Sequence, residues 1–539
     1  MTGEFDLVVV GAGACGAFAA WDAALRGLRV ALIDRGDFGG ATSANSLKIV
    51  HGGLRYLQQA NLPRMRESVR ERAILLRAAP HLVRPLPCLF PTTGHGTRSR
   101  AALAAALALN DALSFDRNQS REPSRQLPRG RTVGRDEFHG LAGPLGVAHA
   151  SGGALWYDGF IESPERLLLA VVRSAEAAGA VVANYVAATA LVRERGRVAG
   201  VRTRAADGTE GELRARVVLN AAGPWARHLT PDGRARAAMP ALVRACNVVV
   251  RRAGPAVAVA VPSAGEQRML FGVPWRGHLV LGTSYRAAAA PEPAAGVAAT
   301  EQDVEGLLAD FNGALPGLAL RRDEVTLAHA GLLPGVARRG DAGGAKGAAT
   351  PLDRAVLLDH AALDALPGLV TVQTVKWTTA RAVAERAVNV CQRQLGASPR
   401  PGGTDHASLV GSPASLEALW AEPPVARVPP ALARRLKELY GTEHHAVLAL
   451  AAARPALAEP LAPGCDVIGA QVVHAIRVER AQRLADVVLR RTELGTLGDP
   501  GEPALAAAAR VAADEAAWPV DRSLAEARQT RDAYAVAPG

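Results

Sequence analysis

The chain has 539 residues, which is enough for two or three domains with large cores. Apolar residues make up 49% and charged residues 21%, so the composition is that of an ordinary globular protein. The formal net charge is +11, but no dense run of lysine and arginine with interleaved aromatic residues occurs, so we expect no nucleic-acid partner. An anionic membrane surface, an acidic ligand or mere arginine-for-lysine usage would each explain the charge.

The cysteines indicate neither a disulfide framework nor a zinc site. Their number is odd, they lie far apart in the sequence and no CxxC occurs, which fits a reducing compartment. We find no charged-then-apolar leader and no uncharged stretch long enough to span a bilayer. We therefore expect a cytoplasmic protein, or one held peripherally on the inner face of the membrane. The five cysteines are Cys15, Cys88, Cys246, Cys391 and Cys465.

The first motif in the chain has the order expected of a dinucleotide-binding unit. An apolar strand-like run ends at Gly11-x-Gly13-x-x-Gly16, which opens a predicted helix. The first glycine permits a tight turn, the second lets backbone N–H groups approach a pyrophosphate, and the third lets helix and strand pack closely. A second apolar run ends at Asp34, roughly twenty residues on, where an acid accepts hydrogen bonds from a ribose. This order is much more specific than the glycines alone.

The residues after Asp34 favour FAD over NAD. Segment 36–57 is rich in small, hydroxyl-bearing residues, which can hydrogen-bond the ribityl chain and ring system of a flavin. Gly52 and Gly53 permit close approach of the backbone. The polar residues of this segment are Thr42, Ser43, Asn45 and Ser46.

At this point the sequence resembles the FAD-dependent glycerol-3-phosphate dehydrogenase family, in which a stretch similar to GTSSRSTKLIHGGLRYL follows the dinucleotide motif. The run from His51 to Tyr56 is identical, and an identity that includes His, Arg and Tyr is far more specific than glycines. Asn45 and Leu47 depart from the family. The other matching residues are Thr42, Ser43, Ser46 and Lys48.

Segment 98–118 is predicted to be an apolar helix flanked by Arg98, Arg100 and Arg117. Two interpretations stay open. The helix packs on the core as a cap, or it lies on anionic lipid and gives a weak membrane contact.

The resemblance continues through the middle of the chain. Residues 156–180 are predicted to form a turn followed by an amphipathic helix, and the residues after them to form strands separated by turns. The run Asn220–Trp225 is close to the family's NATGPW, which lies beside the cofactor in FAD-binding folds. The resemblance therefore implies that Ala222 and Gly223 bind the cofactor and that the backbone of Val186 contacts the adenine.

Residues 241–335 alternate strand-like runs with turns and resemble the family's substrate-binding sheet, with Thr283 in a stretch similar to GTTD. The glycine-rich stretch 338–351 is predicted to be an exposed loop. Residues 368–391 follow as strand, turn and helix, and resemble the family's GGKLTTYR element, whose helix start faces the flavin pyrimidine. The matching residues are Lys376, Thr378, Thr379 and Arg381.

After a predicted linker at 397–404, the rest of the chain has apolar residues at helical spacing. It resembles the family's small helical C-terminal domain, down to Arg490-Arg491-Thr492. His444 and His445 are adjacent, so we expect them on different helix faces as surface residues and not as ligands. The sequence predicts no metal site.

The departures from the family fall at the substrate end. The family's phosphate-binding arginine is replaced by Leu333, and its active-site histidine aligns with Asn247. A second family arginine is absent or displaced to Arg354, and the double glycine before Lys376 becomes Thr374-Val375. An Arg–phosphate contact is one of the stronger polar interactions, and leucine cannot replace it. The alternative is that the alignment is out of register and Leu333 does not stand at the position of the arginine. The cations able to compensate are Arg55, Lys376, Arg338 and Arg339.

The sequence thus predicts an α/β fold: a Rossmann-like FAD/NAD(P)-binding domain with an inserted antiparallel substrate sheet, plus a C-terminal all-α domain. The predicted segments are 1–95, 151–235 and 351–398 for FAD binding, 96–150 for an inserted helical or loop region, 236–350 for the substrate sheet and 405–539 for the helical domain.

The implied chemistry is oxidation of a C–H bond beside oxygen or nitrogen by an FAD-dependent dehydrogenase or oxidase. Hydride passes to flavin N5, and a protein base takes the heteroatom proton. The base candidates are His51, His329 and Lys376. Two of them have an alternative role: His51 could only orient the flavin, and His329 could only pack in the core. The implied catalytic residues are His51, Arg55, His329 and Lys376, and the substrate-binding residues are Arg55, Tyr56, Asn247, Thr283 and Leu333. The residues expected to bind FAD are Gly11, Gly13, Gly16, Asp34, Thr42, Ser43, Ser46, Gly52, Val186, Ala222, Gly223, Lys376, Thr378 and Thr379.

Three functions stay open at this point. The first is oxidation of glycerol 3-phosphate to dihydroxyacetone phosphate, with electrons passed to quinone, another carrier or oxygen. The second is a divergent flavin oxidase or dehydrogenase of an unphosphorylated alcohol or amine in specialised metabolism, which Leu333 favours. The third is a flavin-holding partner subunit without turnover, which Lys376 and the run from His51 argue against.

Overall fold

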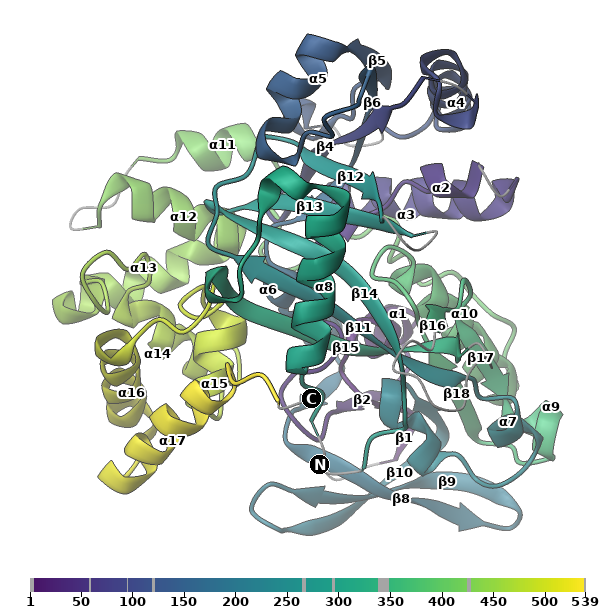
Figure 1. Cartoon of the computed structure of the whole chain (residues 1–539). Helices are drawn as coiled ribbons and strands as arrows, with labels where there is room; N and C mark the ends of the chain where they lie inside the picture. Colours follow the sequence, from purple (N-terminus) through teal and green to yellow (C-terminus); the bar gives the residue numbers. More distant parts are fainter. Residues whose placement is uncertain are drawn as a thin grey trace.

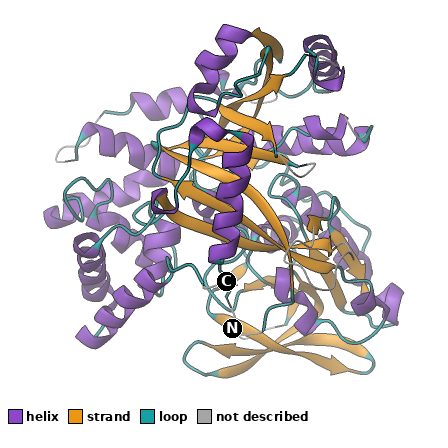
Figure 2. Ribbon diagram, in the orientation of Figure 1, coloured by secondary structure: helices purple, strands orange, loops and turns teal. Residues whose placement is uncertain are grey.

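The structure is a computed structural model. It describes residues 4–57, 60–94, 96–118, 122–263, 268–292, 296–337, 349–423 and 428–537, without the side chains of Arg55 and Ala337. Two sheets form its centre, and the C-terminal helices, yellow-green to yellow in Figure 1, gather at one side. Figure 2 shows that most of the remaining helices lie around the two sheets.

Strand β1 lies in the interior of the first sheet, between β10 and β2. This position fits its apolar side chains, which are almost fully buried. Its neighbours pair in parallel from β18 to β7, while β17 runs antiparallel at one edge. A hairpin of β8 and β9 pairs with the first half of β10. In sheet order the strands are β17 (Val356–Asp359), β18 (Leu369–Gln373), β10 (Glu210–Asn220), β1 (Phe5–Val10), β2 (Val30–Ile33) and β7 (Val181–Ala183), with β8 (Val186–Glu194) and β9 (Arg197–Ala205) beside them.

The helix of the first motif, α1 (Ala14–Leu25), connects β1 to β2 and is buried along almost its whole length. Its alanine-rich sequence lets α6 (Pro164–Ala177) and α10 (Ala380–Gln394) pack against it on the sheet. The predicted order of strand, turn, helix and strand is therefore confirmed. The turn predicted before α6 is wrong, because Trp156 and its neighbours form the end of strand β6 (Gly152–Ile161).

The second sheet is larger and mostly antiparallel. It includes strands from segments that the sequence analysis assigned to FAD binding, namely β3, β4 and β6. Its strands in order are β16 (Ala349–Pro351), β15 (Val325–Ala337), β11 (Ala241–Val250), β14 (His278–Ala288), β13 (Met269–Trp275), β12 (Ala258–Pro262), β4 (Val83–Thr92), β6 and β3 (Ile49–Val50), with β5 (Arg131–Gly134) on β6.

Helix α8 (Glu301–Ala314) covers one face of the second sheet together with α5 (Arg135–Ala142). Sequence analysis predicted only strands and turns in this region. The helix begins with a capping box, in which the side chains of Thr300 and Asp303 each accept a backbone hydrogen bond from the other residue. The remaining helices of this part are α2 (Leu54–Leu57), α3 (Leu62–Ala78), α4 (Arg100–Leu113), α7 (Arg234–Ala237) and α9 (His360–Asp364).

The predicted helical C-terminal domain is confirmed. Buried ion pairs join it to the loop after β2. The Arg491 guanidinium donates to both oxygens of Asp37, each at 2.6 Å, and Arg490 adds a third hydrogen bond at 2.5 Å. Burial raises the pKa of Asp37, but the two arginines outweigh it and hold the pKa well below its usual range. The helices are α11 (Leu416–Ala421), α12 (Pro430–Tyr440), α13 (His444–Ala453), α14 (Gly469–Arg477), α15 (Leu484–Asp486), α16 (Glu502–Ala516) and α17 (Val520–Asp532).

Candidate functional site

A cavity of about 750 Å³ lies where the first sheet meets the second. Its walls include the residues that directly follow the carboxyl ends of β1, β2, β10 and β18, the edge where parallel α/β sheets bind ligands. The opposite wall comes from β11, β14 and β15 of the second sheet.

The three glycines of the first motif have the separate roles that their spacing predicts. Gly11 has a φ of +100°, and a Cβ there would lie 2.6 Å from the Ala221 carbonyl oxygen. A Cβ on Gly16 would lie 1.8 Å from the Gly11 oxygen, so this glycine serves packing and does not line the cavity. Gly13 faces the cavity, where its Cβ would meet only the Ser43 Oγ, at 3.1 Å. This open cradle at the start of α1 fits a pyrophosphate.

Asp34 lines the cavity at the end of β2. Its carboxylate accepts hydrogen bonds from the Ala12 and Gly36 backbone N–H groups at 2.7 and 2.9 Å, which fix its position. Burial raises its pKa to about 6. Val186 does not line the cavity, and its N–H donates to the Asp34 carbonyl at 2.7 Å.

The hydroxyl-rich loop lines the cavity and is held to both sheets. The Thr42 Oγ1 donates to the Leu332 carbonyl of β15 and accepts from the N–H of the same residue, both at 3.1 Å. The Ser43 Oγ accepts from the Ala14 N–H at 2.9 Å, and its carbonyl accepts from the Trp377 indole at 2.8 Å. These hydroxyls therefore also hold the loop. Ser46 lines the cavity too.

The residues before α10 close the cavity from the first sheet. Lys376 and Thr378 line it, whereas Thr379 is the N-cap of the helix and does not. The Thr378 Oγ1 accepts from the His51 N–H at 3.0 Å, which ties the two matching motifs together. Ala222 and Gly223, after β10, line the same wall.

The structure separates the three base candidates. His51 and Lys376 line the cavity, and the Lys376 Nζ donates to the Tyr56 hydroxyl. His329 lies on β15 opposite Asn247 and does not line the cavity. Burial, with a further contribution from the Lys48 charge, lowers the pKa of His329 to about 3. The side chain of Arg55 lies outside the described part of the chain.

Asp158 of β6 is a buried residue that sequence analysis did not single out. Its carboxylate accepts from the Arg72 guanidinium at 2.7 Å and from the Gly52 N–H at 2.6 Å, and it lies 3.8 Å from the His51 Nδ1. Burial raises its pKa, but the contacts with His51 and Arg72 outweigh this and lower it to about 2. Gly52 itself does not line the cavity. It faces Arg72 instead, because a Cβ on Gly52 would lie 1.9 Å from the Arg72 guanidinium. The signal in the sequence was an acid in the WYDG stretch, which was interpreted as a turn.

The predicted substrate residues of the second sheet also line the cavity. The Thr283 hydroxyl donates to the Asn247 side-chain oxygen at 2.7 Å, and Leu333 follows on β15. Arg354 is exposed and does not line the cavity. Arg338 and Arg339 lie outside the described residues, as does most of the predicted loop 338–351.

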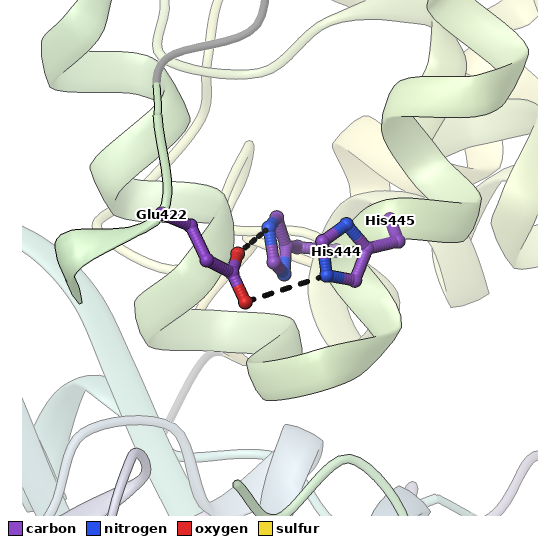
Figure 3. A group of neighbouring side chains, drawn as sticks. All are labelled: Glu422, His444 and His445. Atoms are coloured by element: carbon purple, nitrogen blue, oxygen red, sulfur yellow. Dashed lines mark ion pairs between the residues drawn. The ribbon is translucent and has the colours of Figure 1, made fainter. Parts of the chain in front are cut away.

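The expectation for the two adjacent histidines is wrong for one of them. His444 is buried, and burial lowers its pKa, while His445 is exposed. Their rings lie side by side with centroids 4.0 Å apart, and both rings contact Glu422 (Figure 3). One carboxylate, that of the residue directly after α11, thus reaches both rings at the start of α13.

Two families match the chain in sequence. FAD dependent oxidoreductase matches residues 6–350, and the C-terminal domain of alpha-glycerophosphate oxidase matches residues 403–523. A glycerol-3-phosphate dehydrogenase of Synechocystis sp. is 32% identical over 95% of this chain and 93% of its own length. Glycerol-3-phosphate dehydrogenase 1 of Mycobacterium tuberculosis is 35% identical over 94% of both chains.

The fold is also similar to solved structures. The glycerol-3-phosphate dehydrogenase from Bacillus halodurans, complexed with FAD, gives a TM-score of 0.73 at 23% identity, covering 98% of this chain and 95% of its own. L-proline dehydrogenase from P. horikoshii gives 0.50 at 15% identity, covering 75% and 96%. With the glycine cradle, Asp34 and the α10 start around one cavity, the chain belongs to the FAD-dependent oxidoreductase family, as a glycerol-3-phosphate dehydrogenase-like member that uses FAD as its cofactor.

Proposed function

We propose that this protein oxidises the secondary alcohol carbon of glycerol 3-phosphate, or of a close relative, to a ketone. The substrate loses a hydride from carbon and a proton from its hydroxyl group. FAD, when bound, supplies the hydride acceptor. The observation that carries the proposal is the convergence of His51, Tyr56 and Lys376 on the cavity, next to the start of α10.

His51 is the residue that we propose as the base. Its side chain is 41% exposed and lines the cavity, and its Nδ1 faces the buried carboxylate of Asp158 at 3.8 Å. A carboxylate behind an imidazole orients the ring and stabilises the charge that the ring gains with a proton. Asp158 is thus a positioning residue. The Lys376 ammonium, next to Tyr56, serves to bind the alcohol oxygen and the nearby anionic group of the substrate.

The test is anaerobic mixing of the purified yellow holoprotein with glycerol 3-phosphate while the flavin absorbance is followed. Bleaching within the time of steady-state turnover supports the proposal. The absence of bleaching with glycerol 3-phosphate and with every unphosphorylated alcohol and amine tried would favour a flavin-holding partner subunit. Mixing the bleached protein with a quinone or with oxygen then identifies the electron acceptor, for which we propose a quinone, another carrier or oxygen.

A second candidate function is favoured by Leu333, which lines the cavity at the position where the family resemblance implies a phosphate-binding arginine. Each described cation that lines the cavity already has a protein partner. These pairs are Arg35 on Trp225, Lys48 on Trp275, Arg268 with Asp310, Lys376 with Tyr56, and Arg490 with Asp37. Trp275 and Tyr56 do not neutralise Lys48 and Lys376, so this second candidate rests on Leu333, whose apolar side chain suits an uncharged substituent, as in an unphosphorylated alcohol or amine. Bleaching by such a compound but not by glycerol 3-phosphate would select this candidate.

We also propose a weak contact of α4 with an anionic membrane surface. Leu103 and Leu107 of α4 line the cavity, whereas Leu109 and, just past the helix, Phe115 are 50% and 79% exposed. The helix thus caps the cavity and also presents apolar side chains at its C-terminal end, while the exposed side chains of Arg98 and Arg100 lie at its N-terminal end. In the described residues no helix is long and apolar enough to cross a membrane.

A further inference from the structure

Glu422, His444 and His445 form a cluster in the helical C-terminal domain. None of the three lines the cavity, and the cluster takes no part in the proposed reaction. Glu422 directly follows α11, and the two histidines begin α13 after the short 3₁₀ turn Gly441–Glu443 (Figure 3). In Figure 3 both carboxylate oxygens point toward the rings, one to each. The Oε2 lies 3.0 Å from the His444 Nε2, and the Oε1 lies 3.5 Å from the His445 Nε2.

The hydrogen bonds of His444 determine which ring nitrogen is free to bind a ligand. Its Nδ1 lies 2.7 Å from the Gly441 carbonyl oxygen, which can only accept a hydrogen bond, so the Nδ1 carries the proton. The Nε2 of the neutral ring then presents a lone pair toward the carboxylate. This is the arrangement in which a backbone carbonyl fixes the tautomer of a metal-binding histidine.

Glu422 and His444 approach closely: the Glu422 Oε2 lies 3.0 Å from the His444 Nε2, a contact that either a proton on the Nε2 or a cation between the two atoms would stabilise. Among the described residues the Oε2 of Glu422 has no hydrogen-bond partner, although its surface is buried. Lys437 donates its Nζ to the Glu422 backbone carbonyl at 2.9 Å and stays 3.9 Å from the Oε2. When the His444 ring is neutral, its Nε2 lone pair faces the Glu422 Oε2 at 3.0 Å, and a bound cation would then satisfy both atoms.

The distances suit such a cation. In a tetrahedral zinc site with bonds of about 2.0–2.1 Å, neighbouring ligand atoms are about 3.3 Å apart. The two measured separations, 3.0 and 3.5 Å, lie on either side of this value, and the three ligand atoms all lie within 4.8 Å of one another. Two imidazoles and one carboxylate are a donor set for Zn²⁺ and its neighbours rather than for Ca²⁺ or Mg²⁺, which prefer oxygen ligands.

We propose that Glu422, His444 and His445 bind one Zn²⁺ ion, or a similar divalent transition-metal ion, with solvent in the open position. The bound ion would join the end of α11 to the start of α13 within the helical domain. His445 is 63% exposed, so the ion can enter from solvent after the chain has folded.

The experiment is a titration of the full-length holoprotein, freed of any affinity tag and dialysed against a chelator, with ZnCl₂ by calorimetry. The bound zinc is counted by elemental analysis after gel filtration. We expect one equivalent of zinc per chain. Cobalt in place of zinc should give the intense visible bands of a four-coordinate Co²⁺ site, at wavelengths beyond the flavin absorption.

The variants are His445→Gln and Glu422→Gln, with His406→Gln as the matched control. His445 is exposed, so its replacement should leave folding intact, and Gln lacks the ring nitrogen that binds the metal. Each ligand variant should weaken zinc binding by at least about tenfold, since even outer-shell partners of metal ligands contribute that much. His406 is an exposed histidine beside Asp405, and its replacement should change nothing. Substoichiometric binding, or equal affinity in the wild type and both ligand variants, would overturn the proposal.

Discussion

The two ends of the cavity are built from different parts of the chain. At the FAD end the backbone forms the site: Gly11 supplies a positive φ, Gly13 leaves an open cradle, and the α1 and α10 starts point inward. At the other end the second sheet forms the site with side chains, among them Asn247, Thr283 and Leu333. A backbone site tolerates few changes, whereas one substitution can change what a side-chain wall binds. A family with this construction can therefore keep its cofactor while its substrate changes.

The largest expected effect is loss of the cofactor in Gly13→Val. The φ of −72° and ψ of 179° at this residue suit any amino acid, so the fold should persist. The valine methyl groups would occupy the cradle that the pyrophosphate needs, and we expect no bound FAD. Flavin absorbance per chain after gel filtration measures this. Gly140→Val, at an exposed helical position with open space around its Cβ, should stay fully yellow. A yellow Gly13→Val protein would contradict the assignment of the cradle.

The second effect is on catalysis and separates the base candidates. His51→Asn should lower kcat by about 10²–10⁴ with FAD still bound, because it removes the general base. His329→Asn is the control, since His329 does not line the cavity, and it should keep kcat. If Lys376→Met lowers kcat by this factor and His51→Asn does not, Lys376 is the base.

The third effect is on stability and concerns Asp158, which supports both His51 and the Gly52 backbone. Asp158→Asn leaves the Arg72 guanidinium buried without its counter-charge, which costs about 3–5 kcal/mol at neutral pH. The pKa of Asp158 is lowered to about 2, so its contribution is present above the ordinary carboxyl pKa of about 4 and is lost as the pH falls from about 4 to about 2.

The measurement is thermal unfolding of the holoprotein as a function of pH. The variant should unfold at a lower temperature at pH 7, and its unfolding temperature should fall less steeply than that of the wild type at acidic pH. Asp323→Asn, which breaks only the exposed pair with Arg321, serves as the control and should match the wild type. An Asp158→Asn protein as stable as the control would show that Arg72 finds another partner.

The fourth effect concerns substrate affinity. If Leu333 stands where a phosphate clamp is missing, Leu333→Arg should lower the KM for glycerol 3-phosphate by roughly a hundredfold, the equivalent of about 2–3 kcal/mol. Val336→Arg adds the same charge to the same strand at an exposed position and should have no effect. A low KM in the wild type that Leu333→Arg leaves unchanged would mean that other residues hold the phosphate.

The smallest effect concerns the outer side of α4, which caps the cavity. Replacing Leu109 and Phe115 with serine should weaken flotation with vesicles of phosphatidylglycerol and phosphatidylethanolamine by roughly tenfold. Added salt should weaken the binding of both forms. Serine at Val520 and Leu524, which are exposed on α17, is the control. Absence of salt-sensitive flotation in the wild type would leave α4 as a cap alone.

The sequence by itself determined the first motif, the cofactor and the helical C-terminal domain. The motif and the helical domain depend on short-range rules, namely glycine spacing, an acid after an apolar run and apolar residues at helical spacing. FAD was indicated by the hydroxyl-bearing segment after Asp34 and by the family resemblance. It did not predict α8, because the strand-like runs on either side of that helix dominated the pattern and its capping box at Thr300 was not recognised. It also interpreted the end of β6 as a turn, since Asp and Gly favour turns when no partner strand is known.

Only the tertiary structure decided which of the chemically active residues meet. The sequence left both His51 and His329 as candidates for the base. The register of β11 with β15 buries His329 away from the cavity, whereas the Thr378 hydroxyl, which accepts from the His51 N–H, holds His51 beside it. In the same way, tertiary packing places Glu422, which follows α11, against both histidines at the start of α13, although adjacent residues of a helix were expected to point to different faces. Strand register and helix–helix packing are long-range properties, and they place side chains that local spacing cannot place.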